Sequence, residues 1–262
     1  MLIGYGCALL IGLILGLIGG GGSILTVPIL VYLLGIDPVL ATAYSLFLVG
    51  TTSAVGAFRN YRLGNIAVKT GLVFSIPAFI AVYLTRAYLV PAIPNELGYF
   101  GTLTLTKDMA IMLFFAIIML LAAFSMIRKK SASKDKHPKV NINYAMVVLE
   151  GLVVGVVTGL VGAGGGFLII PALVLLAGLE IKTAIATSLM IIAIKSLIGF
   201  LGDVQNLNID WVFLIPFTAL SVIGIFIGIR FNQNVPSALL KKVFGWFVLI
   251  MGLGILWKEL VL

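Results

Sequence analysis

Long apolar segments dominate this sequence and leave few folds open to it. They cover roughly residues 2–18, 23–35, 38–57, 66–90 and 109–127, and then 142–161, 166–178, 181–201, 211–230 and 240–257. The chain of 262 residues is 61% hydrophobic and 10% charged, whereas a soluble domain has about 25% charged residues. The apolar runs are continuous rather than alternating, which favours helices over the strands of a membrane barrel. The sequence therefore predicts an all-α integral membrane protein.

The two sets of five segments repeat each other. The stretch GLIGGGGSILTVP (16–28) aligns without a gap with GLVGAGGGFLIIP (159–171), so equivalent positions differ by 159 − 16 = 143 residues. We therefore predict a first transmembrane repeat (1–127), a basic linker (128–140) and a second transmembrane repeat (141–262).

Charge in the connecting loops predicts how the two repeats are oriented. The loop after the third segment carries Arg59 and Arg62, whereas the equivalent loop of the second half carries Asp203 and Asp210. The linker 128–140 is strongly basic. Because basic loops stay on the cytoplasmic side, we expect a cytoplasmic linker, a C-terminus outside, and two inverted-topology repeats. Inverted repeats with interrupted helices are a hallmark of secondary transporters.

Consecutive glycines are unusual inside an apolar segment. Each glycine weakens a helix by about 1 kcal/mol relative to alanine, so we expect the helix to break there. The pieces that follow have about 13 residues and rise only about 20 Å, against a hydrocarbon core of about 30 Å. They are predicted to be short re-entrant or broken helices that meet near the midplane. Free N–H groups at their N-termini suit a small oxyanion. Alternatively, the glycines only permit close helix packing.

The third segments add polar groups. Ser188 and Lys195 are seven residues apart and share a helix face, as do Ser45 and Thr52 in the first half. Lys195 is predicted either to attract an anionic substrate or to take part in proton coupling; alternatively, it snorkels to the nearer surface. Glu150 is predicted to relay a proton, to pair with a lysine, or to sit at the interface.

Other groups suggest no further chemistry. Arg86 and Arg230 lie near segment ends, where snorkelling at the membrane boundary accounts for both. Cys7 and His137 are the single cysteine and histidine, so we expect no metal site and no cofactor. The glycine segment lacks the Lys-Ser/Thr of a nucleotide-binding loop.

The duplicated motifs, each followed by a Ser-bearing helix (ATAYSLFLVGTTSAVG and TAIATSLMIIAIKSLIG), resemble the TauE/SafE family of membrane permeases. This resemblance covers nearly the whole chain and implies an anion carrier of the prokaryotic plasma membrane, for sulfite or organosulfonates. By residue match it implies a substrate site near Ser45 and Ser188, lined by Gly19, Gly20, Gly21, Gly22, Ser23, Gly162, Ala163, Gly164, Gly165 and Gly166. Tyr44 stands where the second half has Thr187, which departs from the family pattern.

We therefore expect a secondary transporter that exports a small sulfur-containing oxyanion by alternating access, with proton coupling through Glu150 or Lys195. The alternatives are an importer, a carrier of another small anion, an intramembrane enzyme acting on a lipid phosphate, and a structural subunit. An enzyme would need a paired acid, base or nucleophile near the glycines, and we predict none. The expected partners are the small anion and the lipid bilayer, and no nucleic acid.

Overall fold

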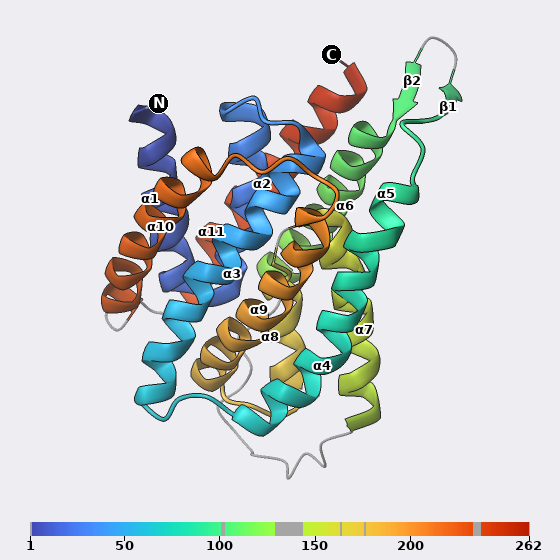
Figure 1. Cartoon of the computed structure of the whole chain (residues 1–262). Helices are drawn as coiled ribbons and strands as arrows, with labels where there is room; N and C mark the ends of the chain where they lie inside the picture. The colour runs from blue at the N-terminus through green and yellow to red at the C-terminus, as the bar shows by residue number, and fades with distance from the viewer. Residues whose placement is uncertain are drawn as a thin grey trace.

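The structure is a computed structural model that describes residues 2–100, 103–128, 144–162, 164–175, 177–232 and 237–261. Most of the linker predicted at 128–140 and Ala163 therefore lie outside the described residues. The described chain is helical except for one β-hairpin and short connections (Figure 1). The hairpin pairs β1 with β2 in antiparallel fashion and was not expected from the sequence.

The first half begins with a long helix and a broken one. Its elements are α1 (Leu2–Ile18), η1 (Gly19–Leu25), α2 (Thr26–Pro28), η2 (Ile29–Leu33), α3 (Pro38–Arg62), α4 (Val68–Leu84), η3 (Thr85–Leu89), α5 (Val90–Ala92), β1 (Glu96–Phe100), β2 (Leu103–Thr106) and α6 (Lys107–Arg128). The start of α3 follows from local chemistry, because the Asp37 side chain accepts hydrogen bonds from the backbone N–H groups of Val39 and Leu40.

The second half follows the same plan without the hairpin. Its elements are α7 (Tyr144–Val161), α8 (Gly166–Leu175), α9 (Ile181–Val204), α10 (Trp211–Asn232) and α11 (Ser237–Val261). Two boundaries differ from the sequence-based expectation. Arg59 and Arg62 belong to the last turns of α3, and Asp203 belongs to α9, so these three residues are not loop residues.

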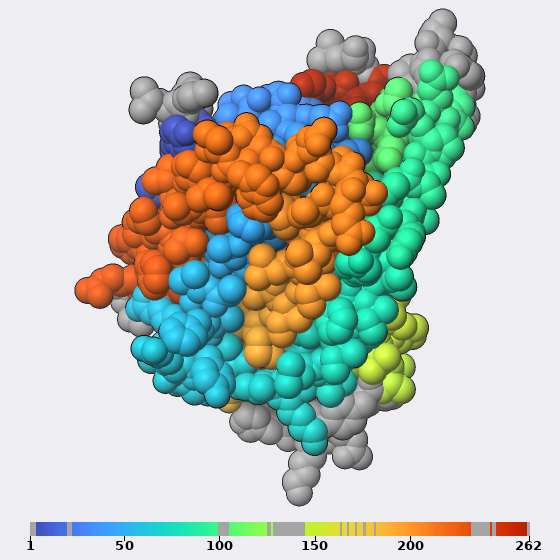
Figure 2. All heavy atoms as spheres, viewed as in Figure 1, coloured from blue at the N-terminus to red at the C-terminus, as the bar shows by residue number. Residues whose placement is uncertain are grey.

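Most close helix pairs join the first half to the second. α1 packs against α10 and α4 packs against α7, while α3 crosses α9 and α6 lies along α11. Figure 2 shows α9 as a band between α3 and α4 on one face of the molecule. Both chain termini and the hairpin lie at one end, and the α3–α4 turn lies at the other (Figure 1).

Glycines make the closest helix contacts possible. A Cβ on Gly16 in α1 would lie 2.5 Å from the Ile225 carbonyl oxygen of α10, and a Cβ on Gly159 in α7 would lie 2.6 Å from Thr85 Cβ. Gly16 and Gly159 are equivalent positions of the repeat. For these helical glycines, close packing is the observed role.

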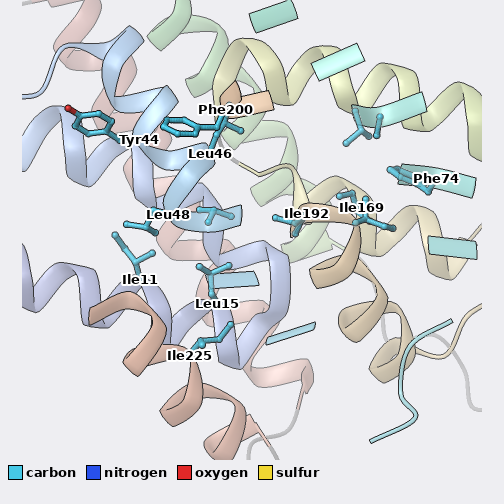
Figure 3. Packing of buried hydrophobic residues seen from close by; sticks show 14 of the residues in the cluster. Ile11, Leu15, Tyr44, Leu46, Leu48, Phe74, Ile169, Ile192, Phe200 and Ile225 are labelled. Carbon is cyan, nitrogen blue, oxygen red and sulfur yellow. The ribbon is translucent and has the colours of Figure 1, made fainter. Parts of the chain in front are cut away.

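The core is apolar and the outer surface is too. Ile11 and Leu15 of α1 gather near Ile225 of α10 in Figure 3, and these side chains are buried. Many large apolar side chains remain exposed, such as Leu149 at 62% and Ile250 at 66%. Within the described residues, five helices are long and apolar enough to cross a membrane. This is the surface of a multi-pass membrane protein, because lipid rather than water covers it.

Candidate anion site at the two glycine breaks

Both halves break their helices with glycines in the left-handed region. Gly19 follows α1 with φ +71°, and its equivalent Gly162 follows α7 with φ +71°. Gly35 and Gly178, which end the two short helical pieces, are equivalent positions as well, with φ +68° and +63°. Residues with a Cβ rarely adopt this conformation. The sequence repeat is therefore also a repeat of backbone conformation.

The contacts around these glycines are mirrored as well. A Cβ on Gly19 would lie 2.6 Å from Ile185 Cγ2 of α9, and a Cβ on Gly162 would lie 2.5 Å from Thr42 Cβ of α3. Thr42 and Ile185 are themselves equivalent positions of the repeat. Each break thus packs against the third helical segment of the other half, α9 for the first break and α3 for the second.

The two breaks contact each other in the interior. A Cβ on Gly164, which has φ +63°, would lie 2.9 Å from Ser23 Cβ and 2.8 Å from Val49 Cγ1. Ser23 is fully buried in η1. The structure thus brings together Ser23 from the first break and Gly164 from the second; that the two residues line one substrate site stays a prediction.

Lys195 reaches the second break. Its side chain is fully buried, and its Nζ donates a hydrogen bond of 2.7 Å to Thr158 Oγ1 of α7. A Cβ on Gly165 would lie 3.1 Å from this Nζ. Among the described residues, no carboxylate lies within ion-pair distance of it. Snorkelling, the alternative considered for Lys195, is therefore wrong, because the ammonium stays in the interior beside the glycines.

The equivalent position of the first half is neutral. Thr52 stands where the second half has Lys195, and its Oγ1 donates to Ser221 Oγ of α10 at 3.3 Å. Ser188 donates to the Ile185 carbonyl of its own helix at 2.8 Å, while the buried Ser45 Oγ has no hydrogen-bond partner among the described residues. None of these three side chains contacts a break through a described hydrogen bond, so their predicted part in the site stays a prediction.

Glu150 lies apart from Lys195. It is partly buried on α7, eight residues before Thr158, which is about 12 Å along a helix axis. One of its carboxylate oxygens, Oε2, is buried without a partner among the described residues. The suggested pairing of Glu150 with a lysine finds no described contact, and its role in proton coupling remains a prediction. Gly20, Gly21 and Gly22 lie within η1, next to Ser23.

Sequence reasoning did not find Thr158 or Ser221, the hydroxyl partners of Lys195 and Thr52. A single threonine or serine in an apolar helix usually bonds its own backbone, so neither residue carried a signal. Only the packing of α7 on the second break and of α10 on α3 brings these hydroxyl groups to Lys195 and Thr52.

Arg86 was also misjudged. Both Arg86 and Arg230 were expected to snorkel. Arg230 is exposed, but Arg86 is 1% exposed and forms an ion pair with the buried Asp203. The arginine lies in η3, directly after α4, and α9 packs against this turn and helps to cover the side chain.

Among the described residues, hollows lie on the surface at residues other than those of the glycine breaks. One, of about 420 Å³, is apolar and includes Phe47, Phe200 and Trp211. Another, of about 470 Å³, is lined partly by Asp37, Glu96 and Asp108 near the hairpin. The breaks themselves are tightly packed around Ser23 and Gly164.

Comparison with known proteins identifies the family of this chain. The family described as "Sulfite exporter TauE/SafE" matches residues 5–255. The chain belongs to the TauE/SafE family. This family of membrane transporters includes relatives named "Probable membrane transporter protein". One from Xylella fastidiosa is 24% identical over 99% of this chain and 96% of its own length. Another, YdhB of Bacillus subtilis, is 28% identical over 89% of this chain and 91% of its own. No solved structure matches this TauE/SafE chain.

Proposed function

We propose that this TauE/SafE protein exports a small sulfur-containing oxyanion, such as sulfite or a sulfonate, across the plasma membrane of a prokaryote. The observation that carries the proposal is Lys195: a fully buried amino group, a cation when protonated, beside Gly165, with a hydroxyl as its partner and no described carboxylate near it. A buried cation of this kind is stabilised by an anion.

The chemistry beside Lys195 favours a small oxyanion. Gly164 and Gly165 carry no side chain, so a ligand can approach the backbone closely, and α8 (Gly166–Leu175) begins directly after them with free N–H groups at its N-terminus. Thr158 adds a hydroxyl. These groups bind negative charge but supply no acid–base pair, so we propose transport rather than catalysis. The sulfur chemistry of the substrate comes from the family description.

We further propose that the two halves have opposite orientations and alternate access to this site. The mirrored contacts of Gly19 with Ile185 and of Gly162 with Thr42 support a two-fold relation between the halves. The helix pairs support it too, because α1 packs against α10 of the second half and the equivalent α7 packs against α4 of the first half. Coupling of transport to protons through Glu150 or Lys195 is part of the same proposal.

Counterflow in proteoliposomes tests the proposed function. Vesicles loaded with unlabelled sulfite are placed in labelled sulfite, and vesicles loaded with sulfate, sulfoacetate or chloride serve as competing loads. We expect transient accumulation of label that depends on internal sulfite, because a carrier exchanges substrate across the membrane. Protein-free vesicles control for leakage of sulfurous acid. Folded protein that gives no counterflow with any sulfur oxyanion would contradict the proposed substrate class.

A further inference from the structure

Arg86 is a second buried cation in this protein. It lies in η3, a π-helical turn between α4 and α5, and its side chain is fully buried. Its partner is Asp203 in the last turn of α9, with 3.4 Å between Arg86 Nη1 and Asp203 Oδ1. A strong hydrogen bond between such charged groups is about 2.7–2.9 Å long. One long contact therefore holds this guanidinium.

The rest of the guanidinium has no described partner. Arg86 Nε and Nη2 are both buried and form no hydrogen bond with any described residue. These two atoms make up the side-on edge of the guanidinium, whose parallel N–H groups match two oxygens of a carboxylate, phosphate or similar oxyanion. Because unpaired buried donors are costly, this edge needs an acceptor.

The position of this edge relates it to Lys195. Asp203 lies eight residues after Lys195 on α9, which is about 12 Å along the helix axis. The η3 turn and the C-terminal end of α9, which carry Arg86 and Asp203, lie towards the end of the molecule that carries the hairpin and both termini (Figure 1). In the repeat, Ile229 is equivalent to Arg86 and Asn60 is equivalent to Asp203, so the opposite end has no such ion pair at these positions.

We propose that the Nε/Nη2 edge of Arg86 binds the transported oxyanion at a second station, between Lys195 and the end of the protein where the termini lie. The proposal rests on the proposed function. Asp203 positions the guanidinium through Nη1 and leaves the other edge to the anion. Its carboxylate also repels the anion, which prevents the second station from holding the substrate too tightly for release.

The test isolates the second station by removing the first. In purified Lys195→Met protein, binding of sulfite is followed by the rise in melting temperature with sulfite concentration, since a ligand that binds only the folded state stabilises it by RT ln(1 + [L]/Kd). We expect weak binding to remain. Adding Arg86→Lys keeps the positive charge but removes the two parallel N–H donors that bind an oxyanion in bidentate fashion, and should weaken sulfite binding by about tenfold or more. Adding Asp203→Asn should tighten binding severalfold, because it removes the repelling charge.

Opposite shifts for the two members of one ion pair separate binding from structural support. If the pair only stabilises the fold, Arg86→Lys and Asp203→Asn lower the melting temperature without changing the sulfite response, and the second station is wrong. Arg230→Lys, an exposed arginine in α10, is the matched control and should change neither.

Two further outcomes decide the remaining cases. Should Arg86→Lys not fold, the Arg86→Met/Asp203→Leu double variant replaces the pair by apolar side chains, an exchange that folded proteins tolerate; it must lose the residual binding, and retention would overturn the proposal. Wild-type protein that neither binds nor exchanges any oxyanion would instead contradict the proposed function itself. Wild-type protein with normal counterflow and Arg86 variants with unchanged binding would overturn only the second station.

Discussion

At the scale of residues, Lys195 determines what the interior can hold. Burying an ammonium group costs several kcal/mol unless opposite charge compensates it, and the described contacts of Lys195 are with neutral groups, Thr158 and Gly165. The repeat provides an internal comparison, because Thr52 fills the equivalent position of the first half without any charge. The two halves therefore differ at this position, and only the second half places an ionisable side chain there.

Replacing Lys195 by methionine should separate stability from function. Methionine is of similar size and neutral, so the desolvation cost disappears and the protein should become more stable by on the order of 1 kcal/mol or more. Sulfite counterflow should fall at least tenfold. Lys182→Met, at an exposed lysine of the same helix α9, should change neither property. Melting temperature and counterflow measure the two effects, and a Lys195→Met protein with normal transport would contradict the role assigned to this ammonium.

At the scale of elements, the two glycine breaks differ from the glycines inside helices. Gly16 and Gly159 permit close contact between helices, whereas Gly162, Gly164 and Gly165 also need a left-handed backbone. The consecutive left-handed glycines end α7 and let α8 begin in a new direction beside Ser23. Sequence analysis offered close packing and a helix break as alternative roles for these glycines. Gly16 and Gly159 have the first role, whereas the left-handed glycines lie where the helices are interrupted.

Alanine at Gly164 should impair transport more than alanine at Gly35 does. Both positions have similar positive φ, +63° and +68°, so both substitutions strain the backbone equally. A Cβ at Gly164 meets Ser23 and Val49 below 3.0 Å, whereas a Cβ at Gly35 has nothing within 4 Å. We expect similar losses of melting temperature from the strain alone, with a further loss and little counterflow only for Gly164→Ala. Equal counterflow in the two variants would show that contact between the breaks is not required.

At the scale of the whole molecule, charge is distributed by end. Beside the turn between α3 and α4, Arg59 and Arg62 lie in the last turns of α3 and Lys69 lies in the first turn of α4. The loop between α9 and α10, at the opposite end in Figure 1, carries Asp210. Because Asp203 belongs to α9 rather than to this loop, the charge difference between the two ends is smaller than the sequence suggested, but its sign is unchanged. The positive-inside rule then predicts that the α3–α4 turn is cytoplasmic and that the end with both termini lies outside.

Cysteine labelling at equivalent positions tests this orientation. Asn65 and Asn208 are exposed, identical in type and equivalent in the repeat. In a Cys7→Ser background, a membrane-impermeant maleimide applied to intact cells should label Asn208→Cys, and should label Asn65→Cys only after the cells are opened. Labelling of both from the same side would contradict inverted halves, and the reverse pattern would contradict the assignment of the cytoplasmic side.

Much of this protein follows from local sequence. Apolar runs and consecutive glycines act over a few neighbouring residues, so the helices, their breaks at Gly19 and Gly162, and the TauE/SafE resemblance could be predicted. The β-hairpin of Glu96–Phe100 and Leu103–Thr106 could not be predicted, because its strands are short and are stabilised by hydrogen bonds to each other. The partners of the buried charges could not be predicted either. Thr158 and Lys195 are 37 residues apart, and Arg86 and Asp203 are 117 residues apart. Hydropathy reflects only the polarity of each residue. The Lys195–Thr158 contact arises where a long side chain of α9 reaches α7 at the second break, and the Arg86–Asp203 contact arises where η3 packs against α9. Only the tertiary structure therefore brings the charged groups to their partners.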